Sequence, residues 1–150
     1  MSPATSEDMA LIGTHDTPTL AGWLTGVDIG ERVRCGLLDP EAVPAVRKER
    51  TLATRRLADR LETDGDDPRG YLAALLDWPG RSASPLVAPW LEDLWLDEAG
   101  VNLPGTRSTE RPHWQRPRNR LLDEALADPE VDALARRLAR ARSSGNDTTD

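Results

Sequence analysis

The sequence has 150 residues, a length that suits one domain of ordinary size and not two. Its formal net charge of −7 argues against attraction of the whole chain to nucleic acid or to an anionic membrane. The chain has no Phe, one Tyr and five Trp, so its core is lean, and we expect it to pack against another polypeptide or to leave part of its length disordered.

The first eight residues are polar and acidic, and we expect residues 1–8 to be a disordered lead-in, without the apolar stretch of a signal peptide. Cys35 is the single cysteine, which fits a reducing cytoplasm because no intramolecular disulfide can form. No run approaches the roughly 18 apolar residues of a membrane span, so a membrane is not expected as a partner.

A short apolar run, Met9 to Ile12, ends at the breaker Gly13 and predicts a buried strand. Thr17 followed by Pro18 is typical of a helix N-cap and a first helical residue. These two residues predict a helix over residues 18–25, which a glycine then terminates. The first elements are therefore a strand, a sharp turn and a helix.

Three further helices are expected before the next strand, over residues 28–38, 40–62 and 68–78. Asp39 before Pro40 repeats the cap-then-proline signal of a helix start. Apolar residues recur along the last two helices and predict buried faces, made of Ala53, Leu57 and Leu61 in one and of Tyr71, Leu72, Leu75 and Leu76 in the other.

The second half alternates short apolar runs with irregular chain. Residues 86–91 predict a strand, in which Pro89 implies an edge, a bulge or a strand end because proline cannot donate a ladder hydrogen bond. Residues 92–96 predict a helical turn whose acidic side chains, Glu92 and Asp93, are solvated. The remaining expected elements are an irregular segment over 100–118, closing helices over 119–127 and 129–142, and a disordered polar tail over 143–150.

Two strands separated by helices cannot close a sheet, and two isolated strands leave backbone ladder groups unpaired. The predicted fold class is therefore α/β and predominantly helical. We expect residues 9–142 to form a slice of a larger α/β domain rather than a complete one.

The sharpest candidate for chemistry is the run Gly13-Thr14-His15-Asp16, between the first expected strand and the helix that follows it. Residues at the ends of strands face the active site in barrel enzymes. An adjacent His and Asp offer a hydrogen-bond donor and a carboxylate to a ligand of sugar size. On residue type alone, the alternative stays open that Asp16 only bonds backbone amides of its own turn.

Residues 13–23, which read GTHDTPTLAGW, resemble the late-barrel signature of amylomaltases, the 4-α-glucanotransferases of glycoside hydrolase family 77. The continuation TGVDI, residues 25–29, is similar to the longer bacterial form of the family. A second likeness follows in the right order, with LEDL at 91–94, VNLPGT at 101–106 and RPHW at 111–114. One departure is His113, where the family usually has Asn.

The resemblance implies a (β/α)8 TIM-type barrel, of which this chain would be the C-terminal part, with the last two strands and the surrounding helices. It implies that Asp16 stabilises the oxocarbenium-like transition state and that His15 hydrogen-bonds the same sugar ring. Thr14, Asn102 and Gly105 would contact the α-1,4-glucan substrate. No cofactor and no metal is implied.

The implied reaction is the retaining transfer of α-1,4-glucan segments between maltodextrins, which needs a nucleophile and a general acid/base, two carboxylates about 5–5.5 Å apart. In the family both lie on strands before the signature, whereas only 12 residues precede Gly13 here. We therefore expect a fragment that lacks both groups and is inactive alone, with the preceding part of the barrel as a candidate partner.

Alternatives from another class stay open. The five Trp could supply stacking faces to a non-catalytic glucan-binding module, and apolar helix faces could serve a helical interaction module. Residues 107–120 hold five Arg together with Trp114, a pattern that also suits nucleic acid, but the acidic chain favours a solvated loop packed over Trp114. The two histidines lie 98 residues apart and no cysteine cluster exists, so no metal site is predicted.

Overall fold

The computed structural model describes residues 5–117 and 120–146. Half of the expected lead-in and half of the expected tail, residues 1–4 and 147–150, lie outside this range. Within it, residues 5–8 form a turn, because Asp8 accepts hydrogen bonds from the backbone N–H and the hydroxyl of Thr5 at 2.7 and 2.9 Å. At the other end the last helix extends to Asn146, so the first residues of the expected tail are helical.

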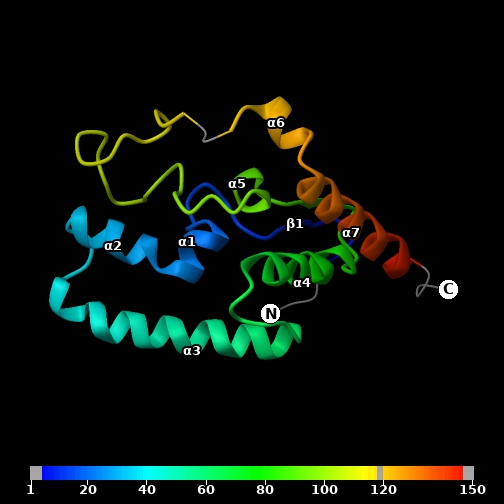
Figure 1. The fold of residues 1–150 in the computed structure, drawn as a ribbon, viewed down its shortest axis with the longest axis horizontal. Coiled ribbons are helices and arrows are strands. Elements are labelled where there is room, and N and C mark those ends of the chain that lie inside the picture. The colour runs from blue at the N-terminus through cyan, green and yellow to red at the C-terminus, as the bar shows by residue number, and fades with distance from the viewer. Residues whose placement is uncertain (1–4, 118–119, 147–150) are drawn as a thin grey trace.

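Both expected strands are present and helices make up most of the described chain, as the fold class predicted (Figure 1). The elements in chain order are β1 (Met9–Leu11), α1 (Leu20–Thr25), α2 (Val27–Arg34), the 3-10 turn η1 (Pro40–Ala42), α3 (Val43–Leu61), α4 (Pro68–Gly80), β2 (Leu86–Ala88), α5 (Leu91–Leu94), α6 (Leu122–Leu126) and α7 (Pro129–Asn146). Residue 119, the expected start of the helix that is observed as α6, lies outside the described residues.

Side-chain caps mark the starts of several helices, and one of the predicted caps is wrong. Asp39 caps η1 and Asp67 caps α4, each accepting from the backbone N–H two residues later. The expected cap Thr17 is wrong, because Thr19 caps α1 by accepting from the N–H of Gly22 at 3.1 Å. The Thr17 hydroxyl instead closes the preceding turn through Thr14, so the helix begins two residues later than Pro18 suggested.

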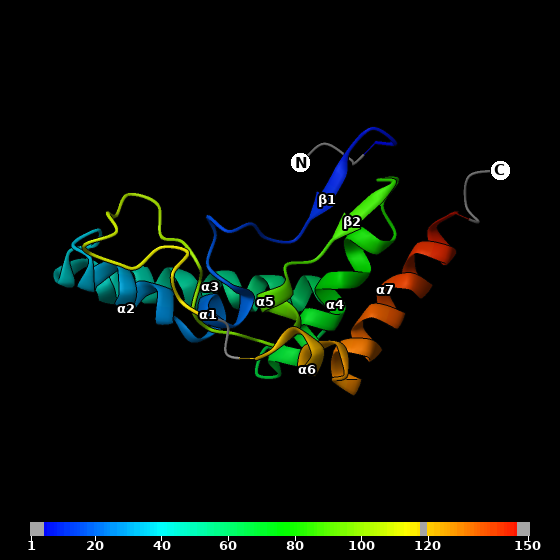
Figure 2. The same cartoon turned by 90° about the horizontal axis from the view of Figure 1, so that it is seen from above.

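The two strands form a parallel pair in which Met9 faces Leu86 and Leu11 faces Ala88. The second strand ends before Pro89, earlier than residue 91, because proline cannot continue the ladder. In a parallel pair the carboxyl ends of both strands lie at the same edge. The segments that follow β1 and β2 therefore leave the sheet side by side (Figure 2).

One face of this small sheet is apolar and open to solvent. Paired residues of a parallel ladder point to the same side, which puts Met9, Leu11 and Leu86 together. Their exposed fractions are 53%, 46% and 56%. The expectation that the run from Met9 to Ile12 forms a buried strand is therefore wrong at Met9 and Leu11, because nothing in the described residues covers this face of the sheet. Figure 2 shows α4 and α7 to one side of the strands. In the described residues the sheet has only these two strands, so each strand also has an unpaired edge.

The core lies where α1, α3, α4 and α7 meet, and its largest fully buried side chains include Tyr71, Leu72 and Leu76 of α4. This confirms the buried face predicted for that helix. The stripe predicted for α3 is partly wrong: Ala53 is exposed and Ala58 is buried. Much of α3 is exposed to solvent, so its apolar spacing only partly predicts its buried side.

Candidate functional site

The turn after β1 carries His15 and Asp16 and is shaped by two threonines. Thr17 Oγ1 accepts from the Thr14 backbone N–H at 2.9 Å and donates to the Thr14 carbonyl at 2.8 Å. Thr14 Oγ1 in turn accepts from the Asp16 backbone N–H at 3.3 Å. The hydroxyl oxygen of Thr14, a residue predicted to bind substrate, therefore helps to form the turn that presents Asp16.

Three of the predicted site residues come together, the adjacent His15 and Asp16 and the distant Asn102. Asn102 Nδ2 donates to Asp16 Oδ1 at 2.6 Å, and His15 Nε2 lies 3.3 Å from the same oxygen. The side chain of Asp16 is 52% exposed and that of His15 is 44% exposed. The Asp16 carboxylate is therefore held on one side by Asn102 and His15 while more than half of its surface stays accessible to a ligand.

Two tryptophans flank the imidazole of His15. The ring centroid of Trp114 lies 5.1 Å from that of His15, with 52° between the planes, and the centroid of Trp90 lies 6.4 Å away at 47°. Trp90 was not expected at the site, because residues 86–91 were predicted to form one strand. The signal that could have found it is Pro89, which ends β2 and moves Trp90 to the carboxyl edge of the sheet.

Gly105, another predicted substrate contact, lies against a different residue. It has a φ of 89°, and a Cβ added there would sit 3.3 Å from Leu37. The left-handed φ explains why glycine occupies the position. No contact in the described residues joins Gly105 to Asp16 or His15, so its role in binding substrate stays a prediction.

Asp93 lies close to the chain on both sides of the turn, at Gly13 and at Leu20. It is 3% exposed and accepts from the Leu20 backbone N–H at 2.6 Å, 73 residues away, at the first turn of α1. Its other oxygen would lie 3.5 Å from a Cβ added to Gly13. Burial raises the pKa of Asp93, which the Leu20 hydrogen bond opposes and the nearby Glu92 reinforces. The prediction that Glu92 and Asp93 are solvated is wrong, because both are buried.

The arginine-rich segment between α5 and α6 is also anchored rather than solvated. Arg111, 8% exposed, pairs with Glu31 of α2 at 2.6 Å and donates to the Gly100 carbonyl. Arg116 donates to the Ala99 carbonyl at 2.6 Å. The expectation of a solvated loop is wrong at these positions. The two guanidinium groups bond backbone carbonyls that have no helix or strand partner, and Arg111 also pairs with a carboxylate of α2. Figure 1 shows the segment running over α1 and α2.

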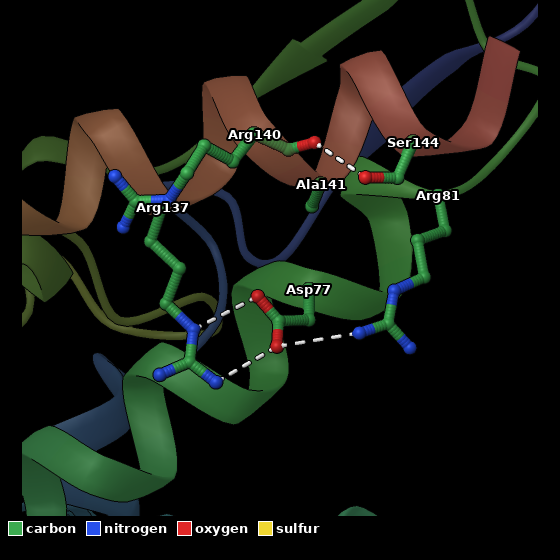
Figure 3. Close-up of a pocket in the computed structure, with 6 residues that line it drawn as sticks. All are labelled: Asp77, Arg81, Arg137, Arg140, Ala141 and Ser144. Atoms are coloured by element: carbon green, nitrogen blue, oxygen red, sulfur yellow. Dashed lines mark hydrogen bonds and ion pairs between the residues drawn. The ribbon is translucent and has the colours of Figure 1, made fainter. Parts of the chain in front are cut away.

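A separate pocket of about 490 Å³ lies between α4 and α7 (Figure 3). Both nitrogens of the Arg137 fork, Nε and an Nη, donate to Asp77 at 2.9 and 2.8 Å, and Arg81 lies 3.7 Å from the same carboxylate. The hydrogen bond from Arg137 lowers the pKa of Asp77. The Asp77–Arg137 pair ties the two helices together and uses none of the residues around Asp16.

The described residues contain no group of three or more His, Cys, Asp or Glu side chains arranged to hold a metal ion. Across residues 5–117 and 120–146, no helix combines the length and apolar character needed to cross a membrane.

The sequence model of the 4-alpha-glucanotransferase family matches residues 1–121. The chain belongs to this family. The 4-alpha-glucanotransferase of Mycobacterium tuberculosis is 31% identical to it over 151 residues, which cover 91% of this chain and 20% of the relative. The enzyme of that name from Haemophilus influenzae is 30% identical over 118 residues, covering 70% of this chain and 17% of the relative. This family member therefore spans about a fifth of the length of these relatives.

A solved structure gives the same fold. Amylomaltase from Corynebacterium glutamicum matches with a TM-score of 0.68 at 22% identity, over 89% of this chain and 21% of that one. This 4-α-glucanotransferase family chain thus has the fold of one part of amylomaltase. The likeness agrees with the predominantly helical α/β class expected from sequence.

Proposed function

We propose that these residues form one wall of a 4-α-glucanotransferase active site, carried on the last two strands of a (β/α)8 barrel. The reaction is the retaining transfer of α-1,4-glucan segments between maltodextrins. The observation that supports this best is the Asp16 carboxylate, which is half exposed and fixed by Asn102 and His15 at the carboxyl edge of two parallel strands.

The residues have distinct roles in this proposal. Asp16 accepts hydrogen bonds from hydroxyls of the central glucosyl ring, and its negative charge stabilises the positive charge that develops in the transition state. His15 hydrogen-bonds the same ring. Asn102 holds Asp16 in place, and Thr14 and Gly105 line the approach of the glucan. The chemistry is carried by carboxylates, so the proposal includes no metal or cofactor.

Retaining transfer needs two more carboxylates, a nucleophile and a general acid/base. We place these in polypeptide outside these 150 residues. Two observations favour such a partner: the chain spans 20% of its M. tuberculosis relative, and the sheet offers an open apolar face, Met9, Leu11 and Leu86, beside unpaired strand edges. The same proposal places the protein in the cytoplasm, because a chain with a single cysteine forms no intramolecular disulfide and suits a reducing compartment.

Glucan binding tests the role of Asp16. Maltoheptaose is titrated into the chain while Trp fluorescence is followed, and the wild type is expected to respond saturably. Asp16→Asn is expected to weaken binding several-fold, because an uncharged amide accepts fewer and weaker hydrogen bonds. Asp132→Asn is the matched control, since both carboxylates are 52% exposed and both contact a neighbouring basic side chain. Equal affinity for wild type and Asp16→Asn would contradict the assignment.

Turnover tests the second half of the proposal. The chain alone is expected to leave maltotriose unchanged, because among the described residues the side-chain contacts of Asp16 are with Asn102 and His15 and bring in no second carboxylate. Glucose release together with longer maltodextrins from the pure chain would contradict this.

A non-catalytic glucan-binding module is the second candidate function. Trp114, 63% exposed, favours it because an open indole face suits sugar stacking. In that case Asp16→Asn keeps full glucan affinity and the chain never takes part in turnover.

A further inference from the structure

We infer that Trp114 is a stacking platform that holds a second glucosyl ring of the glucan beside the one bound by Asp16. The inference rests on the proposed function, because it extends the same site by one sugar. It assigns a ligand of defined class, a neutral pyranose ring that presents its C–H face to the indole.

The backbone of Trp114 is strained. Its φ of 58° lies in the left-handed region that L side chains rarely adopt. Two other non-glycine residues of the described chain share this feature, and each has a structural reason: Glu62 terminates α3, and Leu96 packs against the core. Trp114 neither ends a helix nor fills the core.

Neighbouring contacts hold this strained conformation. The backbone N–H of Trp114 donates to the Val101 carbonyl at 3.3 Å. On one side, His113 Nε2 lies 2.7 Å from the Thr106 hydroxyl oxygen. On the other, Arg116 is bound to Asp97 and to the Ala99 carbonyl. These contacts anchor the backbone on both sides of residue 114, beside Val101 and therefore next to Asn102 in the chain.

The indole of Trp114 is 63% exposed although burial of so large an apolar ring is favourable. Strain and exposure at one residue find no explanation in packing, and both are expected where a side chain is presented to a ligand. The exposed ring lies 5.1 Å from His15, whose imidazole is 3.3 Å from Asp16. An apolar stacking face and hydrogen-bonding groups thus lie side by side, which is the combination that a sugar requires.

Trp78 provides a matched comparison. It is 52% exposed, but it lies within α4 and Arg60 sits 5.8 Å from its ring centroid. Its exposure therefore has an ordinary explanation as a surface residue with a cationic neighbour. In the part of the chain that the structure describes, the ring contact of Trp78 is with Arg60 and not with the residues around Asp16.

The test uses the full chain labelled with 15N and titrated with maltoheptaose, so that the indole N–H signals of the five Trp are followed separately. The Trp114 signal is expected to shift saturably while the Trp78 signal stays in place. Trp114→Ala is expected to raise Kd about tenfold. Trp114→Phe, which keeps a smaller stacking face, should fall between Trp114→Ala and wild type. Trp78→Ala should bind as wild type does.

Two outcomes separate this inference from the proposed function. If Trp114→Ala binds with wild-type affinity while Asp16→Asn binds more weakly, only the stacking role is overturned. If the wild type shows no binding at millimolar sugar, the proposed glucan site itself fails.

Trp114→Gly tests whether the ring serves function or stability. This variant should bind the glucan weakly yet melt no lower than wild type, because glycine relieves the left-handed strain. A clearly lower melting temperature for Trp114→Gly would mean that the ring serves stability, and would overturn the inference.

Discussion

Asn102 Nδ2 donates a 2.6 Å hydrogen bond to Asp16 Oδ1 across 86 residues of sequence. The bond joins the turn after β1 to the irregular segment after α5. It orients the carboxylate without covering it, since Asp16 remains 52% exposed. The site therefore depends on how the second half of the chain is anchored as much as on the run that contains His15 and Asp16.

Replacing Asn102 tests this dependence. Asn102→Ala removes one hydrogen bond to a charged acceptor and is expected to weaken maltoheptaose binding by about tenfold. Asn102→Asp puts a second carboxylate against Asp16 and should weaken binding further. Its melting temperature should lie below that of Asn102→Ala near neutral pH. Equal melting temperatures for the two variants would contradict a direct contact of the two side chains.

Gly22 tests the packing of the segment that leads to Asn102. A Cβ added to Gly22 would collide with the backbone carbonyl of Glu98, so Gly22→Ala is expected to destabilise the fold by about 1–3 kcal/mol. Gly30 is the control, because it lies within α2 with only the distant end of Arg34 near its Cβ position. Gly30→Ala should raise stability by up to about 1 kcal/mol. Urea unfolding measures both, and equal effects would count against the close approach.

The Asp77–Arg137 pair should make stability depend on pH. The hydrogen bond from Arg137 lowers the pKa of folded Asp77, so the unfolded chain binds the proton more tightly. The stabilisation is therefore present above the pKa of an unfolded aspartate, about 3.9, and is lost as pH falls through the lower folded value. Near neutral pH, Asp77→Asn should cost about 1 kcal/mol or less, because Arg137 is 44% exposed. The difference from wild type should vanish in strong acid, as thermal melts across pH would detect.

Asp93 should change stability with pH in the direction opposite to that of Asp77. Burial raises its folded pKa, so the folded chain holds the proton more tightly than the unfolded one. Stability should therefore fall as pH rises from about 3.9 through the higher folded value. Asp93→Asn keeps an acceptor for the Leu20 N–H and should remove this loss, whereas Asp93→Ala should cost about 1–3 kcal/mol. If Asp93→Asn is as destabilising as Asp93→Ala near neutral pH, the carboxylate charge itself is required.

Local signals in the sequence predicted much of this fold. Asp39 and Gly26 mark helix boundaries because a cap or a left-handed residue acts within a few positions of the chain. Thr17 was wrong as a cap because two threonines compete there, and the choice between them depends on the contact of Thr17 with Thr14.

Long-range contacts escaped prediction. Glu92 and Asp93 look like a solvated acidic turn until the packing of α5 against α1 is known. Arg111 looks like one of several loop arginines until Glu31 is brought to it from 80 residues away. His15 and Asp16 could be chosen as site residues because a strand end precedes them and because their run resembles the family signature, but their partner Trp114 depends on how the irregular segment folds back.

The central claim, that Asp16 belongs to a transferase site completed by other polypeptide, is tested most directly by recombining two parts. The M. tuberculosis relative, with the stretch that matches this chain deleted, is mixed with this chain and assayed for glucose release from maltotriose. The account predicts no activity from either part alone, activity from the mixture, and a loss of about 100-fold or more when the chain carries Asp16→Asn. Equal activity with the wild-type and Asp16→Asn chains would contradict the claim.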